Sequence, residues 1–181
     1  MLVHKDRSVL LVIDLQLKLV PAIDQVERVL HAACWVLQVA TQLQIPILLT
    51  EQYPQGLGHT VPEITNLVPA HAIQEKIHFS AWREAPIQQK LQQFKKQQIV
   101  LIGTEAHVCV LQTAMDLIDA GFSVYVVEEA VGSRTQANKA LALQRLQQAG
   151  VQILSQEMLA FEWLERAGTE PFRNISRGWL R

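Results

Sequence analysis

Short apolar runs recur along the chain and are separated by longer amphipathic segments. Five runs are nearly continuous in aliphatic and β-branched residues, as buried strands of parallel sheets are. They are Val9–Ile13, Ile47–Leu49, Ile99–Ile102, Val124–Val127 and Val151–Leu154, and a weaker run covers Ala72–Ile77. The pattern therefore predicts six strands.

The segments between these runs have helical periodicity. Their ranges are Gln25–Leu43, Ile87–Lys96, His107–Ala120, Gln136–Ala149 and Glu157–Arg166. Gly121 and Gly150 follow two of them, where a helix end favours glycine. The alternation of strand and helix predicts an α/β, doubly wound, mainly parallel six-stranded sheet with helices on both faces, in three layers. No repeat or linker divides the chain, so we expect one domain over residues 1–181.

Ligands of such folds bind at the carboxyl ends of the strands. Asp14 directly follows the first run, Lys76 ends the weak run, and Cys109 follows the fourth. A carboxylate, an amine and a thiol thus come from three strand ends on one rim. The Gly- and Pro-rich segment Gln52–Pro62 is a long loop beside them, and long loops in compact domains are often functional.

Cys109 is the most informative of these residues. The apolar run before it ends at Gly103 and the helical pattern starts near His107, which predicts a thiol in the first turn of a helix. Unpaired N–H groups and the helix dipole favour a thiolate there, the nucleophilic form of cysteine. The alternative is that Cys109 is a small buried hydrophobe, as most free cysteines are.

The partners of Cys109 also have two interpretations each. Asp14 is either a proton acceptor for the thiol or else a helix cap or turn former. Lys76 either stabilises the charges of the carboxylate and the thiolate or is a solvated surface lysine. His78 and His107 are possible bases, but a lone histidine is more often a hydrogen-bonded wall. Cys34, on an apolar helical face, is expected in the core.

Composition narrows the classes of function. Of the 181 residues 49% are hydrophobic and 18% charged, with a formal net charge of −1, so neither nucleic acid nor an anionic membrane is an implied partner. The two cysteines have no zinc or disulfide spacing. No G-x-G-x-x-G or P-loop follows the first strand. The N-terminus has no signal-peptide pattern and no run is long enough to span a membrane, which predicts a cytoplasmic protein.

Three motifs resemble those of the isochorismatase-like cysteine hydrolases, a superfamily that includes nicotinamidases and N-carbamoylsarcosine amidases. They are Val12–Gln16, Glu75–Ser80 and Gly103–Val110 followed by Thr113-Ala114, in the family's order. The resemblance extends from about Ser8 to Leu164. Thr50–Gly58 together with Glu105-Ala106-His107 is most similar to the branch called isochorismatase domain-containing proteins.

The resemblance implies roles for particular residues. Cys109 is the nucleophile, Asp14 the general base and acid, and Lys76 the third member of a triad. A cis peptide is implied between Thr104 and Glu105, pointing the Glu105 N–H at the oxyanion beside the Cys109 N–H. We expect the substrate site to include Gln16, Leu19, Gln52, Tyr53, Phe79 and His107.

Departures from the family's patterns refine the expectation. Nicotinamidases carry a metal-binding Asp-x-His after the second strand, where this chain has Gln52-Tyr53-Pro54, so we expect no metal and no cofactor. Leu19 stands where an aromatic is often found, which weakens the expectation of a wall for a flat ring. Isochorismatases cleave a vinyl ether and need no cysteine, so Cys109 favours hydrolysis of a C–N bond through a thioester.

The sequence therefore predicts a cofactor-free cysteine hydrolase of a small amide or related acyl substrate. The alternative is a binding or interaction module that retains the fold and triad without significant turnover. A homo-oligomer, a dimer or larger, is expected because the tail, residues 167–181, holds apolar residues with no obvious place in the core.

Overall fold

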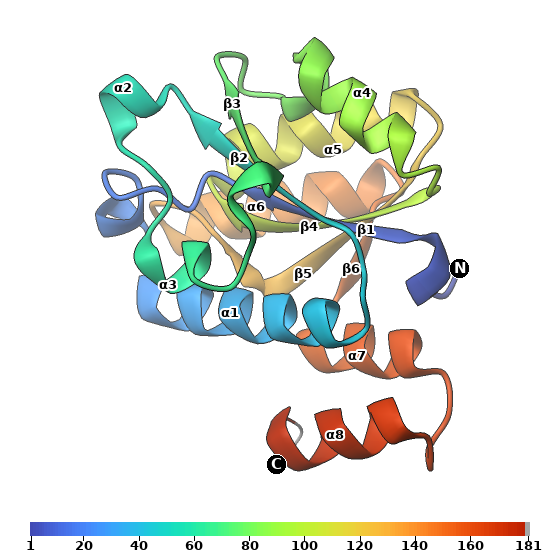
Figure 1. Cartoon of the computed structure of the whole chain (residues 1–181). Helices are drawn as coiled ribbons and strands as arrows, with labels where there is room; N and C mark the ends of the chain where they lie inside the picture. The colour runs from blue at the N-terminus through green and yellow to red at the C-terminus, as the bar shows by residue number, and fades with distance from the viewer. Residues whose placement is uncertain (180–181) are drawn as a thin grey trace.

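The chain folds around one six-stranded sheet (Figure 1). The computed structural model describes residues 1–179. The strands are β1 (Ser8–Ile13), β2 (Ile47–Gln52), β3 (Ile73–Lys76), β4 (Gln98–Thr104), β5 (Ser123–Gly132) and β6 (Gln152–Leu154). Their order is β3-β2-β1-β4-β5-β6, and every neighbouring pair is parallel. The predicted fold class is confirmed.

Helices cover both faces of the sheet. The α-helices are α1 (Val26–Gln42), α2 (Pro54–Leu57), α3 (Pro62–Thr65), α4 (Ala85–Gln93), α5 (Leu111–Asp119), α6 (Gln136–Gln148), α7 (Gln156–Leu164) and α8 (Glu170–Trp179). Short 3-10 turns are η1 (Lys5–Arg7), η2 (Val20–Ala22), η3 (Ala70–Ala72) and η4 (Ala81–Arg83), and η5 (Ala106–Val110) is a π-helical turn. Helices α1 and α7 pack on one face, and α4, α5 and α6 on the other.

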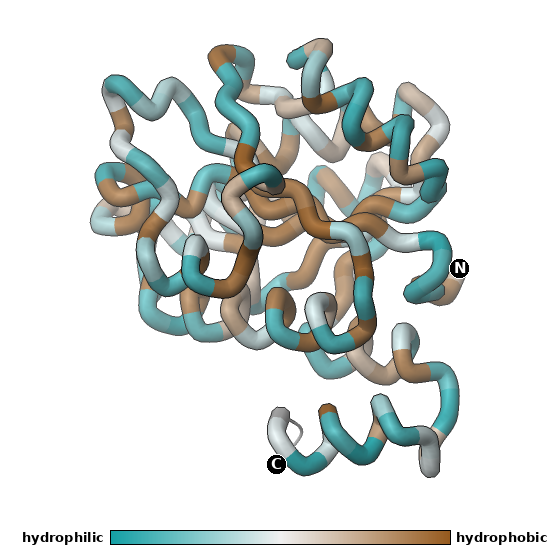
Figure 2. Tube along the Cα trace, viewed as in Figure 1, coloured by the Kyte–Doolittle hydropathy of each residue, from teal (hydrophilic) through white to brown (hydrophobic). Residues whose placement is uncertain are grey.

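The sequence of β1 shows why helices must cover both faces of the sheet. All six of its residues are buried. Leu10 and Val12 belong to the core beneath α1, whereas Leu11 and Ile13 belong to the core beneath α4 and α5. Side chains alternate between the faces of a strand, so an unbroken apolar run requires burial on both. Figure 2 shows the apolar residues concentrated along these strands.

The strand order creates a crevice at the carboxyl end of β1. Chain connections run to β2 on one side of β1 and to β4 on the other, which makes β1/β4 the topological switch point where doubly wound folds bind ligands. Ile13 aligns with Thr50 of β2 and with Gly103 of β4. Asp14 and the turn after β4 therefore lie at this crevice.

Gly103 is required by the close approach of β4 to β1. Its φ is +129°, and an added Cβ would lie 2.0 Å from the carbonyl oxygen of Ile13. The β4–β5 register also shifts between Leu101 and Gly103. Only glycine fits a strand at such a backbone approach.

The C-terminal segment differs from the sequence-based expectation. Residues 170–179 form α8, whose start is capped by the Thr169 hydroxyl, which accepts the Phe172 N–H at 3.2 Å. Ile175 is fully buried in the α1-side core and Phe172 packs against it. The statement that the tail residues have no place in the core is therefore wrong for these two, while Leu180 lies outside the described residues.

Within the described residues, 1–179, no helix combines the length and apolarity needed to cross a membrane.

Candidate active site

Asp14 lies directly after β1 and is completely buried. Its φ of +50° turns the chain out of the strand, a conformation that aspartate tolerates better than most residues. The Thr50 hydroxyl donates to Oδ1 at 2.6 Å, and the Lys76 ammonium lies 2.7 Å from Oδ2. The carboxylate is thus an internal ion-pair partner and not a helix cap.

Lys76 ends β3 and is also buried, with 1% of its surface exposed. Besides the ion pair, its Nζ donates to Gln52 Oε1 at 2.6 Å and to the carbonyl oxygen of Phe79 at 3.1 Å. A buried lysine persists only when it is paired and hydrogen-bonded. The alternative of a solvated surface lysine is therefore wrong.

Two buried glutamines hold Lys76 in place. Gln16 accepts the Gln52 N–H at 2.6 Å and donates to the carbonyl oxygens of Gln52 and Gly58. Gln52 in turn donates to the carbonyl oxygen of Ile77 at 2.7 Å. Both amides are satisfied by the protein itself, which favours a positioning role; contact of Gln16 and Gln52 with substrate stays a prediction.

Cys109 lies in η5, the π-helical turn between β4 and α5, with 3% of its surface exposed. Its thiol interacts with both the Asp14 carboxylate and the Lys76 ammonium. The three side chains that the sequence singled out are therefore together at the carboxyl edge of the sheet.

The pKa of the Cys109 thiol is raised, mainly by burial and also by the negative charge of Asp14, against a smaller opposing effect of Lys76. The expectation of a low-pKa thiol is wrong. The helix-start argument considered only the local dipole and N–H groups, whereas burial and the Asp14 charge act in the opposite direction, and Asp14 also neutralises Lys76 at 2.7 Å. A raised pKa favours the neutral thiol as the resting form of Cys109.

Burial also raises the pKa of Asp14, although Lys76 and Thr50 oppose the effect. A raised carboxyl pKa means a stronger base, closer to the pKa range that suits proton transfer near neutrality. A thiol of raised pKa therefore lies beside a carboxyl group of raised pKa, an arrangement that can pass one proton from sulfur to oxygen.

The turn before Cys109 departs from the implied geometry. The Thr104–Glu105 peptide is trans, as are all peptide bonds among the described residues. The chain turns instead through Glu105, with φ +57°, and through η5. The implied cis peptide is therefore wrong, and the direction it gave to the Glu105 N–H no longer follows. Thr104 fixes the turn by donating its hydroxyl to the Asp14 carbonyl oxygen at 2.5 Å.

Glu105 supports the turn from inside the protein. The Arg134 guanidinium donates to Oε1 at 2.9 Å, and Nδ1 of His107 lies 3.5 Å from Oε2. The same Nδ1 contacts the Ser133 hydroxyl at 3.1 Å. His107 is thus half-buried with both of these partners on one ring nitrogen, and its contact with substrate stays a prediction.

The remaining predicted residues lie in the loops after β1, β2 and β3. Leu19 is half-buried, whereas Tyr53 and Phe79 are each about half exposed, at 51% and 52%. His78 is turned away to Glu84, with Nδ1 2.9 Å from Oε1. A substrate-binding role of Leu19, Tyr53 and Phe79 stays a prediction.

Sequence reasoning missed Thr50, which donates to Asp14, and its neighbour Glu51, which binds His59 and Thr60 of the following loop. Glu51 Oε1 accepts the N–H and hydroxyl of Thr60, and Oε2 pairs with His59 at 3.0 Å. Although burial opposes the effect, these donors lower the pKa of Glu51, and Glu51 raises the pKa of His59. In the sequence, the signal for these contacts was the polar pair Thr50-Glu51 directly after the apolar run Ile47–Leu49.

Cys34 is only half-buried, which corrects its placement in the closed core. Its side chain packs against the α1-side core, and the thiol lies 3.6 Å from the carbonyl oxygen of Glu63. Burial, followed by the charge of Glu63, raises the pKa of Cys34.

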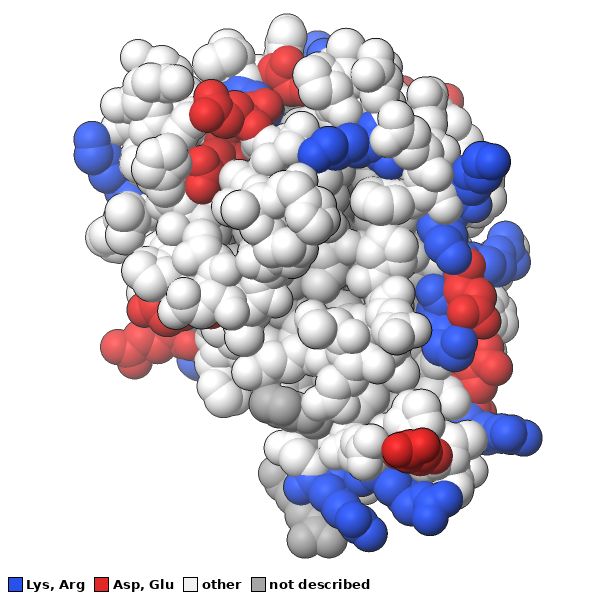
Figure 3. All heavy atoms as spheres, viewed as in Figure 1, with Lys and Arg blue, Asp and Glu red and all other residues white. Residues whose placement is uncertain are grey.

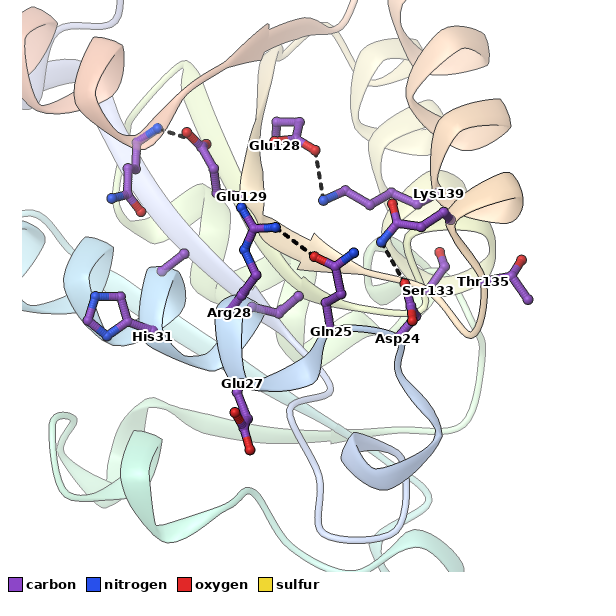
Figure 4. A pocket seen from close by; sticks show the side chains of 14 residues that line it. Asp24, Gln25, Glu27, Arg28, His31, Glu128, Glu129, Ser133, Thr135 and Lys139 are labelled. Atoms are coloured by element: carbon purple, nitrogen blue, oxygen red, sulfur yellow. Dashed lines mark hydrogen bonds and ion pairs between the residues drawn. The ribbon is translucent and has the colours of Figure 1, made fainter.

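A cavity of about 490 Å³ includes none of Asp14, Lys76 and Cys109, and it reaches their surroundings through Ser133, the partner of His107. Figure 4 shows it between the start of α1, the end of β5 and α6. Its polar groups pair with one another: Lys139 with Glu128 at 2.8 Å, and Gln136 with Asp24 at 2.6 Å. Within residues 1–179 no three His, Cys, Asp or Glu side chains are grouped to hold a metal ion.

Comparison with known proteins identifies the family of this chain. The isochorismatase domain matches residues 8–158. Isochorismatase domain-containing protein 2 of Danio rerio is 39% identical over 173 residues, covering 94% of this chain and 85% of the relative. The structure of MAR1 ribonuclease from Caenorhabditis elegans superimposes with a TM-score of 0.93 at 33% identity, covering 100% of this chain and 93% of that one.

A more distant structure shares the fold. The YcaC gene product from Escherichia coli, described as an octameric hydrolase of unknown specificity, gives a TM-score of 0.89 at 24% identity, covering 96% of this chain and 85% of that one.

Proposed function

Because the chain belongs to the isochorismatase domain family, we propose that it is a hydrolase that cleaves a small amide or related acyl substrate through a Cys109 thioester. The observation that carries the proposal is the buried Asp14–Lys76 pair at 2.7 Å with the Cys109 thiol against it. A protonated nucleophile beside a carboxylate base of raised pKa is the arrangement that covalent acyl transfer needs.

Acylation begins when Asp14 accepts the thiol proton as sulfur attacks the substrate carbonyl carbon. The oxyanion that forms is bound by N–H groups of the turn, with that of Cys109 the nearest. Asp14 then gives its proton to the leaving nitrogen as the C–N bond breaks. The products of this half-reaction are an amine or ammonia and the Cys109 thioester.

Deacylation uses the same groups in reverse. Asp14 accepts a proton from water, whose oxygen attacks the thioester carbonyl, and the tetrahedral intermediate collapses to a carboxylic acid. The departing thiolate takes the proton back. Lys76 stays positively charged beside the negative charge while that charge moves between Asp14 and sulfur, which lowers the cost of that movement in a buried site.

The burial of Cys109, which is 3% exposed, favours a small-molecule substrate. We propose that Leu19, Tyr53 and Phe79, in the loops after β1, β2 and β3, contribute to its binding. The reaction as written requires no metal and no cofactor. We further propose that neither nucleic acid nor membrane is a partner, that the chain forms a homo-oligomer, and that it acts in the cytoplasm.

The burial of Cys109 also favours a second candidate. A nucleophile that is almost closed off suits a binding or interaction module that keeps the fold and triad without significant turnover. The two candidates differ in whether a covalent adduct forms at Cys109.

The deciding experiment exposes the protein to a panel of small amides, ureas and isochorismate, with RNA included because a similar structure carries the name ribonuclease. Intact-mass spectrometry follows acyl adducts, and product formation follows turnover. We expect an adduct on the wild type and on Cys34→Ala but none on Cys109→Ala. Turnover that persists in Cys109→Ala would refute the thioester mechanism, and binding without an adduct would favour the module.

A further inference from the structure

A second cavity, of about 440 Å³, lies at the opposite, amino-terminal edge of the sheet. It exists because β3 is short: β3 begins with Ile73 opposite Leu49, so the first two residues of β2, Ile47 and Leu48, have no β3 partner. The turn η3 and the segment before it, together with α4 and the end of α1, surround the gap.

The lining is mainly apolar with a single formal charge. Ile45, Leu48, Leu67 and Phe94 are among its apolar residues, and the acidic side chains Asp and Glu are absent from the described lining. Lys90 of α4 is the one charged group. Figure 3 shows this face as a hollow of uncharged atoms with basic atoms on its α4 side. A cavity of this size and composition is typical of small-molecule sites.

Lys90 has capacity for a ligand. Its Nζ donates one hydrogen bond, of 2.9 Å, to the carbonyl oxygen of His71 in η3. An ammonium group has three donors, so two remain for an anion. A ligand with an apolar body and one anionic head group would therefore be complementary to this cavity.

The cavity is linked to the active site by two strands. Ile47 and Leu48 begin β2, which ends at Gln52, the acceptor for Lys76. Ala72, a wall of the cavity, directly precedes β3, which ends at Lys76 itself. From this continuity we propose that the cavity is an effector site for a small amphipathic monoanion of the medium-chain carboxylate class.

Ligand binding in this cavity is expected to make Cys109 less accessible to reagents. Because Cys109 is 3% exposed, we expect a reagent to reach it faster when the protein opens locally. The edge strand β3 has one neighbour in the sheet, so we expect it to open at a lower free energy than the central strands do. A ligand that bridges Lys90 and the apolar walls stabilises the closed form, so it reduces that opening.

Binding is tested by calorimetry with octanoate, 1-octanol and octylammonium, all below their micelle concentrations. We expect octanoate to bind at least fivefold more tightly than octylammonium. Lys90→Gln should raise the octanoate Kd at least fivefold and leave 1-octanol within twofold. Lys90→Arg should retain binding, and the exposed Lys95→Gln on the same helix end is the matched control. Equal octanoate affinity in Lys90→Gln and Lys95→Gln would overturn the proposal.

Coupling is tested by the rate at which iodoacetamide alkylates Cys109 in a Cys34→Ala background. Saturating octanoate should slow alkylation at least twofold, and Lys90→Gln should abolish this effect. An unchanged rate would overturn the assignment as an effector site. Loss of octanoate binding in Cys109→Ala would place the ligand in the active site and overturn it as well. Neither readout needs turnover, so the result is independent of the proposed hydrolase activity.

Discussion

Replacing Asp14 with asparagine should make Cys109 more reactive towards alkylation while it makes catalysis worse. The Asp14 charge raises the pKa of the thiol and the Lys76 charge lowers it. The asparagine variant loses the Asp14 charge and keeps the Lys76 charge. It also tolerates the φ of +50° at this position, so the turn keeps its shape.

The size of the effect follows from the charge removed. A unit charge about 4 Å away at an effective dielectric constant of about 20 contributes about 4 kcal/mol, which is about 3 pKa units. Thiolate fraction then rises about 1000-fold at pH well below the pKa, but intrinsic nucleophilicity falls with a Brønsted slope of about 0.4–0.5. The net expectation is a rise of about 30-fold in the alkylation rate at pH 7.

The assay is the second-order rate of carbamidomethylation in a Cys34→Ala background, followed by intact mass from pH 6 to 10. Wild-type Cys109 should react slowly at pH 7 and faster as the pH rises, whereas Asp14→Asn should shift the profile to lower pH. Turnover of a confirmed substrate should fall about 10²–10⁴-fold in the same variant, because the proton acceptor is lost.

The reasoning fails if Asp14→Asn alkylates no faster than the wild type while it remains folded by circular dichroism. In that case the Asp14 charge does not hold the thiol protonated. Thr50→Val is a useful comparison, because it removes only the hydroxyl that donates to Asp14 at 2.6 Å and keeps the charge.

The other predictions concern the backbone, pH, metal and assembly. Gly103→Ala should lower thermal stability by several °C more than Gly121→Ala, since both residues have positive φ but only at Gly103 would a Cβ meet backbone, at 2.0 Å; thermal denaturation checks this. In a pH–rate profile, the acid limb of kcat/KM should have its midpoint above pH 3.8. Activity needs ionised Asp14, and burial raises the pKa of Asp14, so the rate is lost as the pH falls through that raised value. Dialysis against EDTA should leave turnover unchanged, and restoration by added zinc would contradict this. Light scattering should give at least twice the 20.4 kDa chain mass, and a monomer at micromolar concentration would count against assembly.

Much of the fold was readable from the sequence because its physics is local. Unbroken apolar runs such as that of β1 demand burial on both faces, and glycines such as Gly121 mark helix ends through their positive φ. The α/β class and the strand-end positions of Asp14, Lys76 and Cys109 follow from these patterns. The start of α8 also has a sequence signal, because Thr169, which caps the helix, is followed by Pro171 in the first turn.

The state of the site was decided only by the tertiary structure. Burial and pairing depend on neighbours that are distant along the chain: Lys76 is neutralised by Asp14, and Thr50 reaches Asp14 from another strand. A helix-start argument for Cys109 sees the local dipole and not these charges, so it predicted the wrong direction for the thiol pKa. The sequence determined which groups meet, and packing determined which of them carries the proton.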